Sequence, residues 1–226
     1  MVKLVVVGCQ GRMGTMVVDC IKTVDEFDYL GGVTSSDSLT QALSKMSPDV
    51  VIDLTNPSVV FDHATTYLTH QIPSIIGTTG LSQPEIVKLT GQAKSQQLGM
   101  MILPNFSIAM ALLQKCVALV SPYFDKAEII ESHHPQKIDS PSGSAVLTQS
   151  VIAQSQMVPS NVPIHSVRMP GILAKQEVVL GASGETLSLS HQVIDRAAFM
   201  PGLMLAIQKI QTCRQLIVGL EQVLDL

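Results

Sequence analysis

Residues 131–145, ESHHPQKIDSPSGSA, gather side chains that donate protons and bind anions in one short stretch. Two histidines stand side by side, and Lys137 comes four residues after His133. A histidine is the commonest general acid near neutral pH, and a nearby lysine lowers its pKa and eases proton release. The run Ser142–Ser144 follows a proline and suits a first helical turn, whose N–H groups and hydroxyls bind anions. The stretch therefore predicts a site for a small acidic substrate that receives a proton.

A metal site is the alternative use of paired histidines. His133 and His134 follow a predicted strand, and neighbouring side chains of an extended chain point to opposite faces. No nearby Cys or third His completes a ligand set. We expect no metal here.

The elements before this stretch alternate regularly. Apolar strands are predicted at residues 3–8, 27–34, 49–55, 73–79 and 98–103, and helices at residues 13–24, 38–46, 58–71 and 82–97. Apolar strands separated by crossover helices indicate a parallel sheet covered on both faces. We predict an α/β fold that begins with a doubly wound, Rossmann-like domain.

The pattern changes after Asn105. Helices are predicted at residues 107–124 and from near Ser142, with strands at 127–132, 165–169, 176–182 and 185–193. Hairpin-like breaks are expected at Pro170-Gly171 and Ser183-Gly184. These elements predict an α+β domain on an open mixed sheet. Residues 198–219 are expected to form one long helix, interrupted early by Pro201-Gly202.

A glycine-rich turn directly follows the first predicted strand and opens the first helix. Gly8, Gly11 and Gly14 would allow a tight turn and close approach of backbone N–H groups to a pyrophosphate. Arg12 would add a cation. A purely structural turn is the alternative. The segments GTTG (residues 77–80) and PNFS (residues 104–107) follow later strands at the same edge, which holds the ligand in open α/β sheets.

The second strand ends in a sequence without the usual ribose-binding groups. Such folds place an acid there for NAD or an arginine for the 2′-phosphate of NADP. Ser35 and Ser36 are neither, and Asp37 is the nearest acid. The choice between NADH and NADPH stays open.

Composition narrows the class further. Of 226 residues, 46% are hydrophobic and 14% charged, which indicates a well-buried globular protein. A net charge of −4 gives no electrostatic footprint for nucleic acid, and no apolar run is long enough for a membrane span. The four cysteines are widely spaced, so we expect free thiols in a reducing cytoplasm.

The chain resembles the dihydrodipicolinate reductase (4-hydroxy-tetrahydrodipicolinate reductase) family of lysine and diaminopimelate biosynthesis. The resemblance rests on VVGCQGRMG, IIGTTG, PNFSI, ESHHPQKIDSPSGSA and GETLSLSHQVIDRAAF, in that order, and spans the chain from residue 2 to the end. The histidine-containing motif is highly specific, whereas the glycine turn alone is not.

The resemblance implies roles for individual residues. His133 would be the proton donor, and Lys137 would act in catalysis and in substrate binding. The other groups that bind the substrate carboxylates would be His134, Ser142, Gly143 and Ser144. The nicotinamide cofactor, NADH or NADPH, would be lined by Gly8, Arg12, Met13, Gly77, Thr79, Asn105 and Phe106. Further cofactor-binding candidates at the same strand ends are Gly11, Ser35, Thr78 and Pro104.

The resemblance also implies a domain organisation. Residues 1–104 with 197–226 would form the dinucleotide-binding domain, to which the C-terminal helix returns, and residues 105–196 the substrate-binding and oligomerisation domain. Members are commonly homotetramers through the second domain's sheet. Gln176, Ala109 and Pro201 depart from the family pattern, and we expect these departures to affect edges and loops.

Three functions remain open at this point. The first is hydride transfer to a cyclic dicarboxylate imine or its hydrated precursor. The second is a Rossmann-fold oxidoreductase acting on another amino-acid-derived acid. The third is a dinucleotide-binding protein without turnover.

Overall fold

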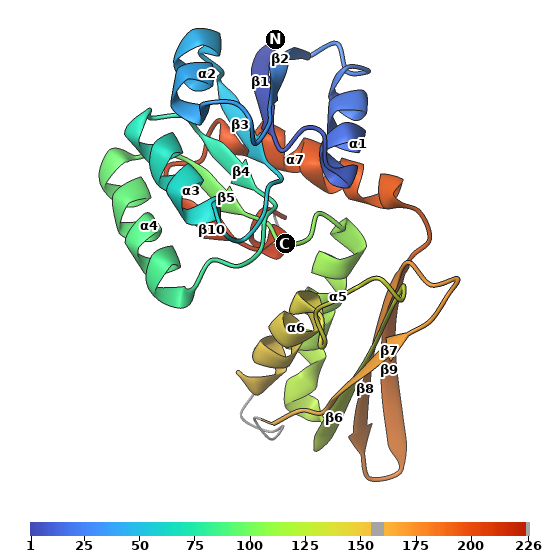
Figure 1. Ribbon diagram of the computed structural model, residues 1–226. Coiled ribbons are helices and arrows are strands. Elements are labelled where there is room, and N and C mark those ends of the chain that lie inside the picture. The colour runs from blue at the N-terminus through green and yellow to red at the C-terminus, as the bar shows by residue number, and fades with distance from the viewer. Residues whose placement is uncertain (155–160, 225–226) are drawn as a thin grey trace. The chain divides into compact units, whose positions relative to one another are not determined.

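The computed structural model describes residues 1–154 and 161–224, and the chain forms two compact units. Unit 1 comprises Met1–Phe106 and Met200–Leu226, and unit 2 comprises Ser107–Phe199. The chain thus leaves unit 1, builds unit 2 and returns (Figure 1).

Unit 1 is built on a six-stranded parallel sheet, which confirms the predicted Rossmann-like architecture. Its strands are β1 (Val2–Val7), β2 (Phe27–Val33), β3 (Val50–Asp53), β4 (Ser74–Ile76), β5 (Met100–Ile102) and β10 (Leu216–Val218). The strand order is β10-β5-β4-β3-β1-β2. The chain runs from β1 outward to β2 and then crosses back to β3, so the topological switch point lies between β1 and β3. Ligands bind at this point in such sheets.

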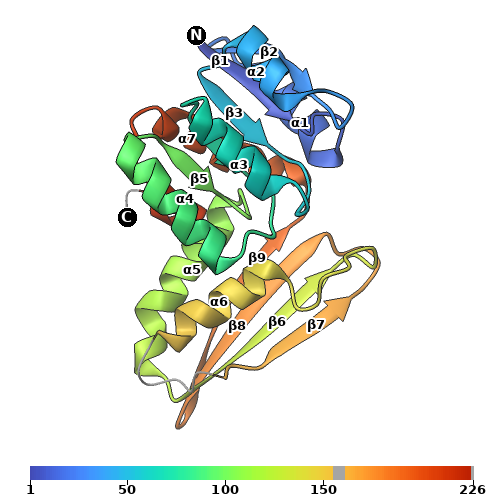
Figure 2. The same ribbon diagram turned by 60° about the vertical axis from the view of Figure 1, so that its left-hand side comes forward.

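Helices cover both faces of this sheet, as the continuous apolar strands require. They are α1 (Arg12–Ile21), α2 (Leu39–Met46), α3 (Val60–Thr69), α4 (Gln83–Gln96) and α7 (Met200–Ile210). Figure 2 shows α2, α3 and α4 on one face, with α1 and α7 on the other. The four side chains of β3 are fully buried between them.

The C-terminal segment corrects one prediction. The expected long helix over residues 198–219 ends at Ile210, and Leu216–Val218 form strand β10 beside β5. The apolar run Leu-Ile-Val finds the open edge of β5, and this pairing outweighs local helical preference. Pro201 does not interrupt the helix, because it is the second residue of α7, where no helical N–H bond is lost.

Unit 2 is a four-stranded mixed sheet covered on one face by helices (Figure 1). Its elements are α5 (Ile108–Val120), β6 (Lys126–His133), α6 (Gly143–Ala153), β7 (Ile164–Arg168), β8 (Ala174–Ala182) and β9 (Glu185–Val193). The order is β7-β6-β8-β9, with β6 and β7 parallel and the other pairs antiparallel. Short 3-10 turns, η1 (Ser121–Tyr123), η2 (Arg196–Phe199) and η3 (Leu220–Gln222), complete the described chain.

The two breaks expected in this sheet differ. Ser183-Gly184 joins paired strands β8 and β9 as a two-residue hairpin turn, with Gly184 at a φ of +88°. Pro170-Gly171 does not form a hairpin, because β6 lies between β7 and β8. Strands β6 and β8 are therefore the two central strands of this sheet.

Gly202 is a packing constraint that the fold imposes on α7. A Cβ there would overlap the carbonyl oxygen of Phe106, a backbone atom that cannot rotate away. Gly202→Ala should therefore reduce the free energy of unfolding by about 1–3 kcal/mol. Gly91→Ala is the control: Gly91 lies exposed in α4 with no atom within 4 Å of the new Cβ, and alanine there should stabilise by about 0.5–1 kcal/mol. Urea unfolding measures both, and equal effects would contradict this account of α7 packing.

Candidate functional site

His133 ends β6 and is held by a carboxylate on the same strand. Glu131 lies two residues earlier, so strand alternation places both side chains on one face. His133 Nδ1 lies 2.5 Å from Glu131 Oε2. An ionised carboxylate only accepts hydrogen bonds, so Nδ1 carries the hydrogen and Nε2 is left to gain and release the second proton. This is the arrangement in which an acid orients a catalytic imidazole.

Glu131 is held in turn by unit 2. Its side chain has no exposed surface. Arg168 at the end of β7 donates to both carboxylate oxygens, at 3.1 and 2.9 Å, and the N–H of Ser142 donates to Oε1 at 3.3 Å. Arg168 also donates to the carbonyl oxygen of Asp139 at 2.7 Å. The arginine thus ties together β6, β7 and the loop that follows His133.

Burial and charge act on the pKa values of this group in opposite directions. Burial raises the pKa of Glu131, but hydrogen bonds from Arg168, Ser166 and His133 lower it more, so the carboxylate stays ionised. Burial lowers the pKa of His133, the Glu131 hydrogen bond and charge raise it, and the charges of Lys137 and Arg168 lower it again. The net pKa of His133 is below the ordinary value. Lys137 acts in the predicted direction, although burial is the larger cause.

The other groups of the motif lie on the loop after β6 and at the start of α6. Lys137 Nζ pairs with Asp139 Oδ1 at 2.8 Å, and a hydrogen bond from the Gly143 N–H helps lower the pKa of Asp139. His134 Nδ1 lies 3.2 Å from Gln136 Oε1. The Asp139 carboxylate therefore contacts both the lysine and the first N–H of α6.

Ser142 differs from its neighbours in exposure. It is the N-cap of α6, its Oγ accepts from the Ala145 N–H at 3.3 Å, and its side chain is buried. Because its own N–H donates to Glu131, its polar groups have partners inside the protein. Gly143 is exposed and Ser144 half-buried at the same helix start.

In unit 1, the glycine turn after β1 has the shape that a dinucleotide needs. Gly8 has a φ of +80°, and a Cβ there would lie 2.5 Å from the carbonyl oxygen of Leu54. A Cβ on Gly14 would overlap the carbonyl oxygen of Gly8. Helix α1 starts at Arg12 with Gly11 as N-cap, no capping side chain and no acid in its first turn. Its first N–H groups are thus left for an anion, which fits the pyrophosphate of NADH or NADPH.

The loops after β4 and β5 end at the same edge of the sheet. Gly77 lies against two side chains: a Cβ there would be 2.7 Å from both Leu54 Cδ2 and Phe106 Cε2. Phe106 is buried, and Thr78 is buried with its hydroxyl donating to Asp53 at 3.2 Å. Thr79 and Pro104 are exposed, and Asn105 and Met13 are half-buried. The structure thus brings the predicted cofactor residues of β1, β4 and β5 to one edge, with Thr78 turned inward.

The loop after β2 is closed on itself. Asp37 Oδ2 accepts from the Thr34 N–H at 2.8 Å and from the Thr34 hydroxyl at 2.6 Å. These hydrogen bonds lower the pKa of Asp37. Ser35 is exposed beside this turn. The carboxylate is therefore fixed at the end of β2.

The position of Gln176 corrects one prediction. This departure from the family pattern is expected to affect edges and loops, but Gln176 is buried in β8, directly opposite Glu131 in the strand register. Alternation turns it toward the helices with Val178 and Leu180. Its Nε2 donates to Thr148 Oγ1 in α6 at 2.7 Å.

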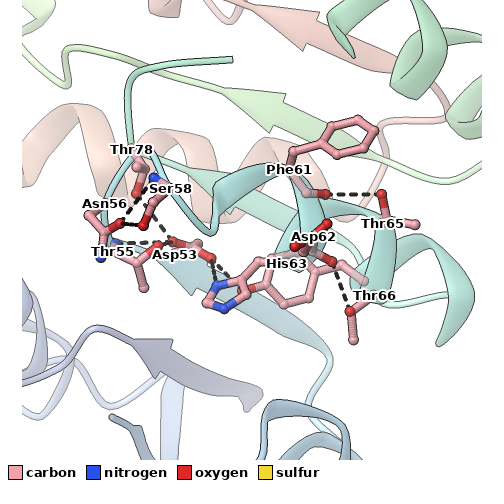
Figure 3. Close-up of polar contacts among 11 residues, drawn as sticks. Asp53, Thr55, Asn56, Ser58, Phe61, Asp62, His63, Thr65, Thr66 and Thr78 are labelled. Carbon is pink, nitrogen blue, oxygen red and sulfur yellow. Dashed lines mark hydrogen bonds and ion pairs between the residues drawn. The ribbon is translucent and has the colours of Figure 1, made fainter. Parts of the chain in front are cut away.

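Sequence reasoning missed three charged residues that the structure places at these sites. Glu131 could have been found from its spacing of two before His133. Asp53 could have been found as an acid that ends a wholly apolar strand. Figure 3 shows Asp53 among Thr55, Thr78 and His63. Arg168 carries no such signal, because its place beside Glu131 depends on the pairing of β6 with β7.

Across residues 1–154 and 161–224, no group of three or more His, Cys, Asp or Glu could hold a metal ion. The same residues contain no helix with the length and hydrophobicity to cross a bilayer. All four cysteines are free thiols.

A doubly wound parallel sheet with a glycine turn, followed in the chain by a mixed-sheet unit, is an architecture of nicotinamide-dependent oxidoreductases. Sequence models of the N-terminal and C-terminal domains of dihydrodipicolinate reductase match residues 2–106 and 106–224. The chain therefore belongs to the dihydrodipicolinate reductase family.

Individual relatives agree with this assignment over their whole length. The 4-hydroxy-tetrahydrodipicolinate reductase of Legionella pneumophila (strain Lens) is 37% identical, over 98% of this chain and 99% of its own. The reductase of Trichormus variabilis is 35% identical over 99% and 98%. The dipicolinate-bound dihydrodipicolinate reductase from Paenisporosarcina sp. TG-14 superposes with a TM-score of 0.86 at 29% identity, over 99% of this chain and all of that one.

The contacts of His133 predict that neutralising Glu131 and neutralising Lys137 shift its pKa in opposite directions. Glu131→Gln removes a charge that favours the imidazolium and should lower the pKa of His133 further. Lys137→Gln removes a cation that disfavours it and should raise that pKa. NMR titration of the His133 ring measures both shifts, with exposed His165 as the internal reference. Shifts of the same sign in the two variants would refute this electrostatic account.

Proposed function

We propose that this protein reduces 4-hydroxy-tetrahydrodipicolinate to tetrahydrodipicolinate in lysine and diaminopimelate biosynthesis, with His133 as the proton donor. The observation that carries the proposal is the Glu131–His133 contact at the end of β6, which leaves Nε2 to release a proton. A nicotinamide cofactor, when bound, supplies the hydride. The substrate would lose its hydroxyl group with one ring hydrogen as water and would gain that hydride and one proton, which leaves NAD(P)⁺.

The remaining residues of the motif would bind the two carboxylates of the substrate. Lys137 would give a charge-assisted hydrogen bond and Gly143 the first N–H of α6, with Ser144 beside them at the helix start. His134 would complete the carboxylate site, whereas Ser142 would hold the start of α6 in place, because its N–H and hydroxyl already have partners inside the protein. Asp139 already contacts both Lys137 and the Gly143 N–H, so a substrate carboxylate would compete with it for both groups. We also propose that the enzyme works in the cytoplasm, where its free thiols persist.

Turnover tests the proton donor. His133→Ala should lower kcat by about a hundredfold or more, because a positioned general acid contributes about 10²–10⁴. NADH binding should stay as in the parent protein. Lys137→Ala should lower kcat/KM severely, since it removes a cation for the substrate carboxylate. The assay follows NAD(P)H absorbance with freshly made substrate.

His70→Ala is the control, because the His70 ring bonds the carbonyl oxygen of Thr66 in its own helix α3, which belongs to unit 1. A His133→Ala variant that keeps turnover but loses NADH binding would contradict the assignment. An unchanged kcat/KM in Lys137→Ala would contradict the proposed role of Lys137 in substrate binding and catalysis.

We propose that both NADH and NADPH are used. No arginine follows β2 to bind a 2′-phosphate, and Asp37 is held by Thr34. With neither strong attraction nor close repulsion, the two kcat/KM values should lie within about tenfold, or about 1.4 kcal/mol. Asp37→Asn removes the acid nearest in sequence to the end of β2 and should raise kcat/KM for NADPH relative to that for NADH. A preference above roughly a hundredfold would show another group reading the 2′ position.

We propose a homotetramer formed through the open face of the unit 2 sheet. Helices α5 and α6 cover one face, and no helix of residues 107–154 or 161–199 covers the other (Figures 1 and 2). That face carries Ile130 and Val179 beside polar side chains. Light scattering should give four times the 24.2 kDa chain mass, and Val179→Lys should reduce it. A monomer at micromolar concentration would refute the proposal.

A further inference from the structure

Asp53 is a buried carboxylate that neither the proton-donor site nor the predicted cofactor list uses. It ends β3, beside the switch point between β1 and β3, and its side chain has no exposed surface. Removing a carboxylate from water is unfavourable unless donors replace the lost hydration. The identity of these donors shows what the carboxylate connects.

The two oxygens of Asp53 have different partners. Oδ1 accepts from the N–H of Thr55 at 3.0 Å, from the Thr55 hydroxyl at 2.6 Å and from Thr78 Oγ1 at 3.2 Å. Oδ2 accepts from His63 Nδ1 at 2.9 Å and Tyr67 OH at 2.6 Å. Burial raises the pKa of Asp53, but the hydrogen bonds from His63, Thr55 and Tyr67 lower it more, so the group is an anion. Figure 3 shows the carboxylate with Thr55 and Thr78 on one side and His63 on the other.

The division has a geometric meaning. Oδ2 is anchored to helix α3, which carries His63 and Tyr67. Oδ1 holds the loops after β3 and β4. The carboxylate therefore fixes two loops of the ligand-binding edge against one helix.

Leu54, the residue after Asp53, transmits this constraint to the glycine turn. Its carbonyl oxygen lies 2.5 Å from the place of a Gly8 Cβ, and its Cδ2 lies 2.7 Å from that of a Gly77 Cβ. Leu54 thus fills the space between the first turn and the loop after β4. A shift of Leu54 would move both glycine positions.

We propose that Asp53 is a positioning residue for the dinucleotide: through Oδ1 it sets the separation of the Gly8 turn and the Gly77–Thr79 loop. The inference rests on the proposed cofactor site. Failure of the parent protein to bind NADH would overturn that function before any Asp53 variant is compared. The competing role is that of a core carboxylate that serves stability alone.

NADH affinity, measured by fluorescence titration well below the unfolding temperature, separates the two roles. Asp53→Ala should raise the Kd for NADH about tenfold or more, while kcat at saturating NADH changes less than about threefold. The displaced loops would take part in NADH binding and not in the chemical step. Asp53→Asn keeps an oxygen for Thr55 and Thr78 and should restore the Kd to within about threefold of the parent value.

Tyr67→Phe is the matched control, since it removes a donor from Oδ2 and leaves Oδ1 intact. It should lower the unfolding temperature but leave the Kd within about twofold. If Asp53→Ala and Tyr67→Phe change the Kd alike at similar loss of stability, the positioning role is overturned.

Thr78→Val carries the test if Asp53→Ala does not fold. It is a shape-matched change that removes the bond between Asp53 and the loop after β4. We expect a Kd raised about threefold or more, with Thr78→Ser close to the parent value. An unchanged Kd in Thr78→Val would overturn the inference.

Discussion

The burial of one carboxylate, Glu131, is the constraint on which unit 2 depends. A glutamate without exposed surface in the centre of a sheet needs a donor for each oxygen, and three elements supply them: β6 through His133, β7 through Arg168 and the start of α6 through Ser142. Replacing any of these leaves a buried charge short of partners, which is costly. The same set of bonds fixes which nitrogen of His133 carries its first hydrogen. Stability and proton chemistry therefore share one group.

Unit 1 holds a second buried carboxylate, Asp53, which also bonds a histidine. Asp53 ends a fully buried strand, and Glu131 lies in a central strand of unit 2. The donors to Asp53 come from one helix and two loops. In both units a buried anion joins backbone segments that are distant in sequence. Loops at the ends of strands are otherwise the most mobile parts of such folds. A satisfied buried charge is a means of fixing them.

The sequence predicted elements well wherever periodicity and turn residues agreed. The five N-terminal strands and their helices follow from apolar runs broken by helical spacing, and the Ser183-Gly184 hairpin follows from its turn chemistry. The sequence predicts a helix at Leu216–Val218, but the open edge of β5 makes this segment a strand. Pro170-Gly171 predicts a hairpin, but a turn signal does not say which strand lies between its flanks.

The site could be predicted only in part, because the sequence shows residues that are close along the chain but not partners on neighbouring strands. The residues of the ESHHPQKIDSPSGSA motif lie close in sequence, and most of them lie near one another in the structure. Arg168 is 37 residues from Glu131, and their contact arises only from the pairing of β6 with β7. The inward turn of Gln176 follows from its register in β8, which composition cannot give. Residue types were thus readable, whereas the partners across strands were not.

A double-mutant cycle on kcat tests most directly whether Glu131 works through the His133 proton. Glu131→Gln, His133→Ala and the double variant are compared at one pH, with folding checked by circular dichroism. Glu131→Gln should lower kcat about tenfold or more in the parent protein but less than about twofold in the His133→Ala background, since residues that act as a unit are not additive. Equal losses in both backgrounds would show that Glu131 acts independently of His133 and would contradict the account.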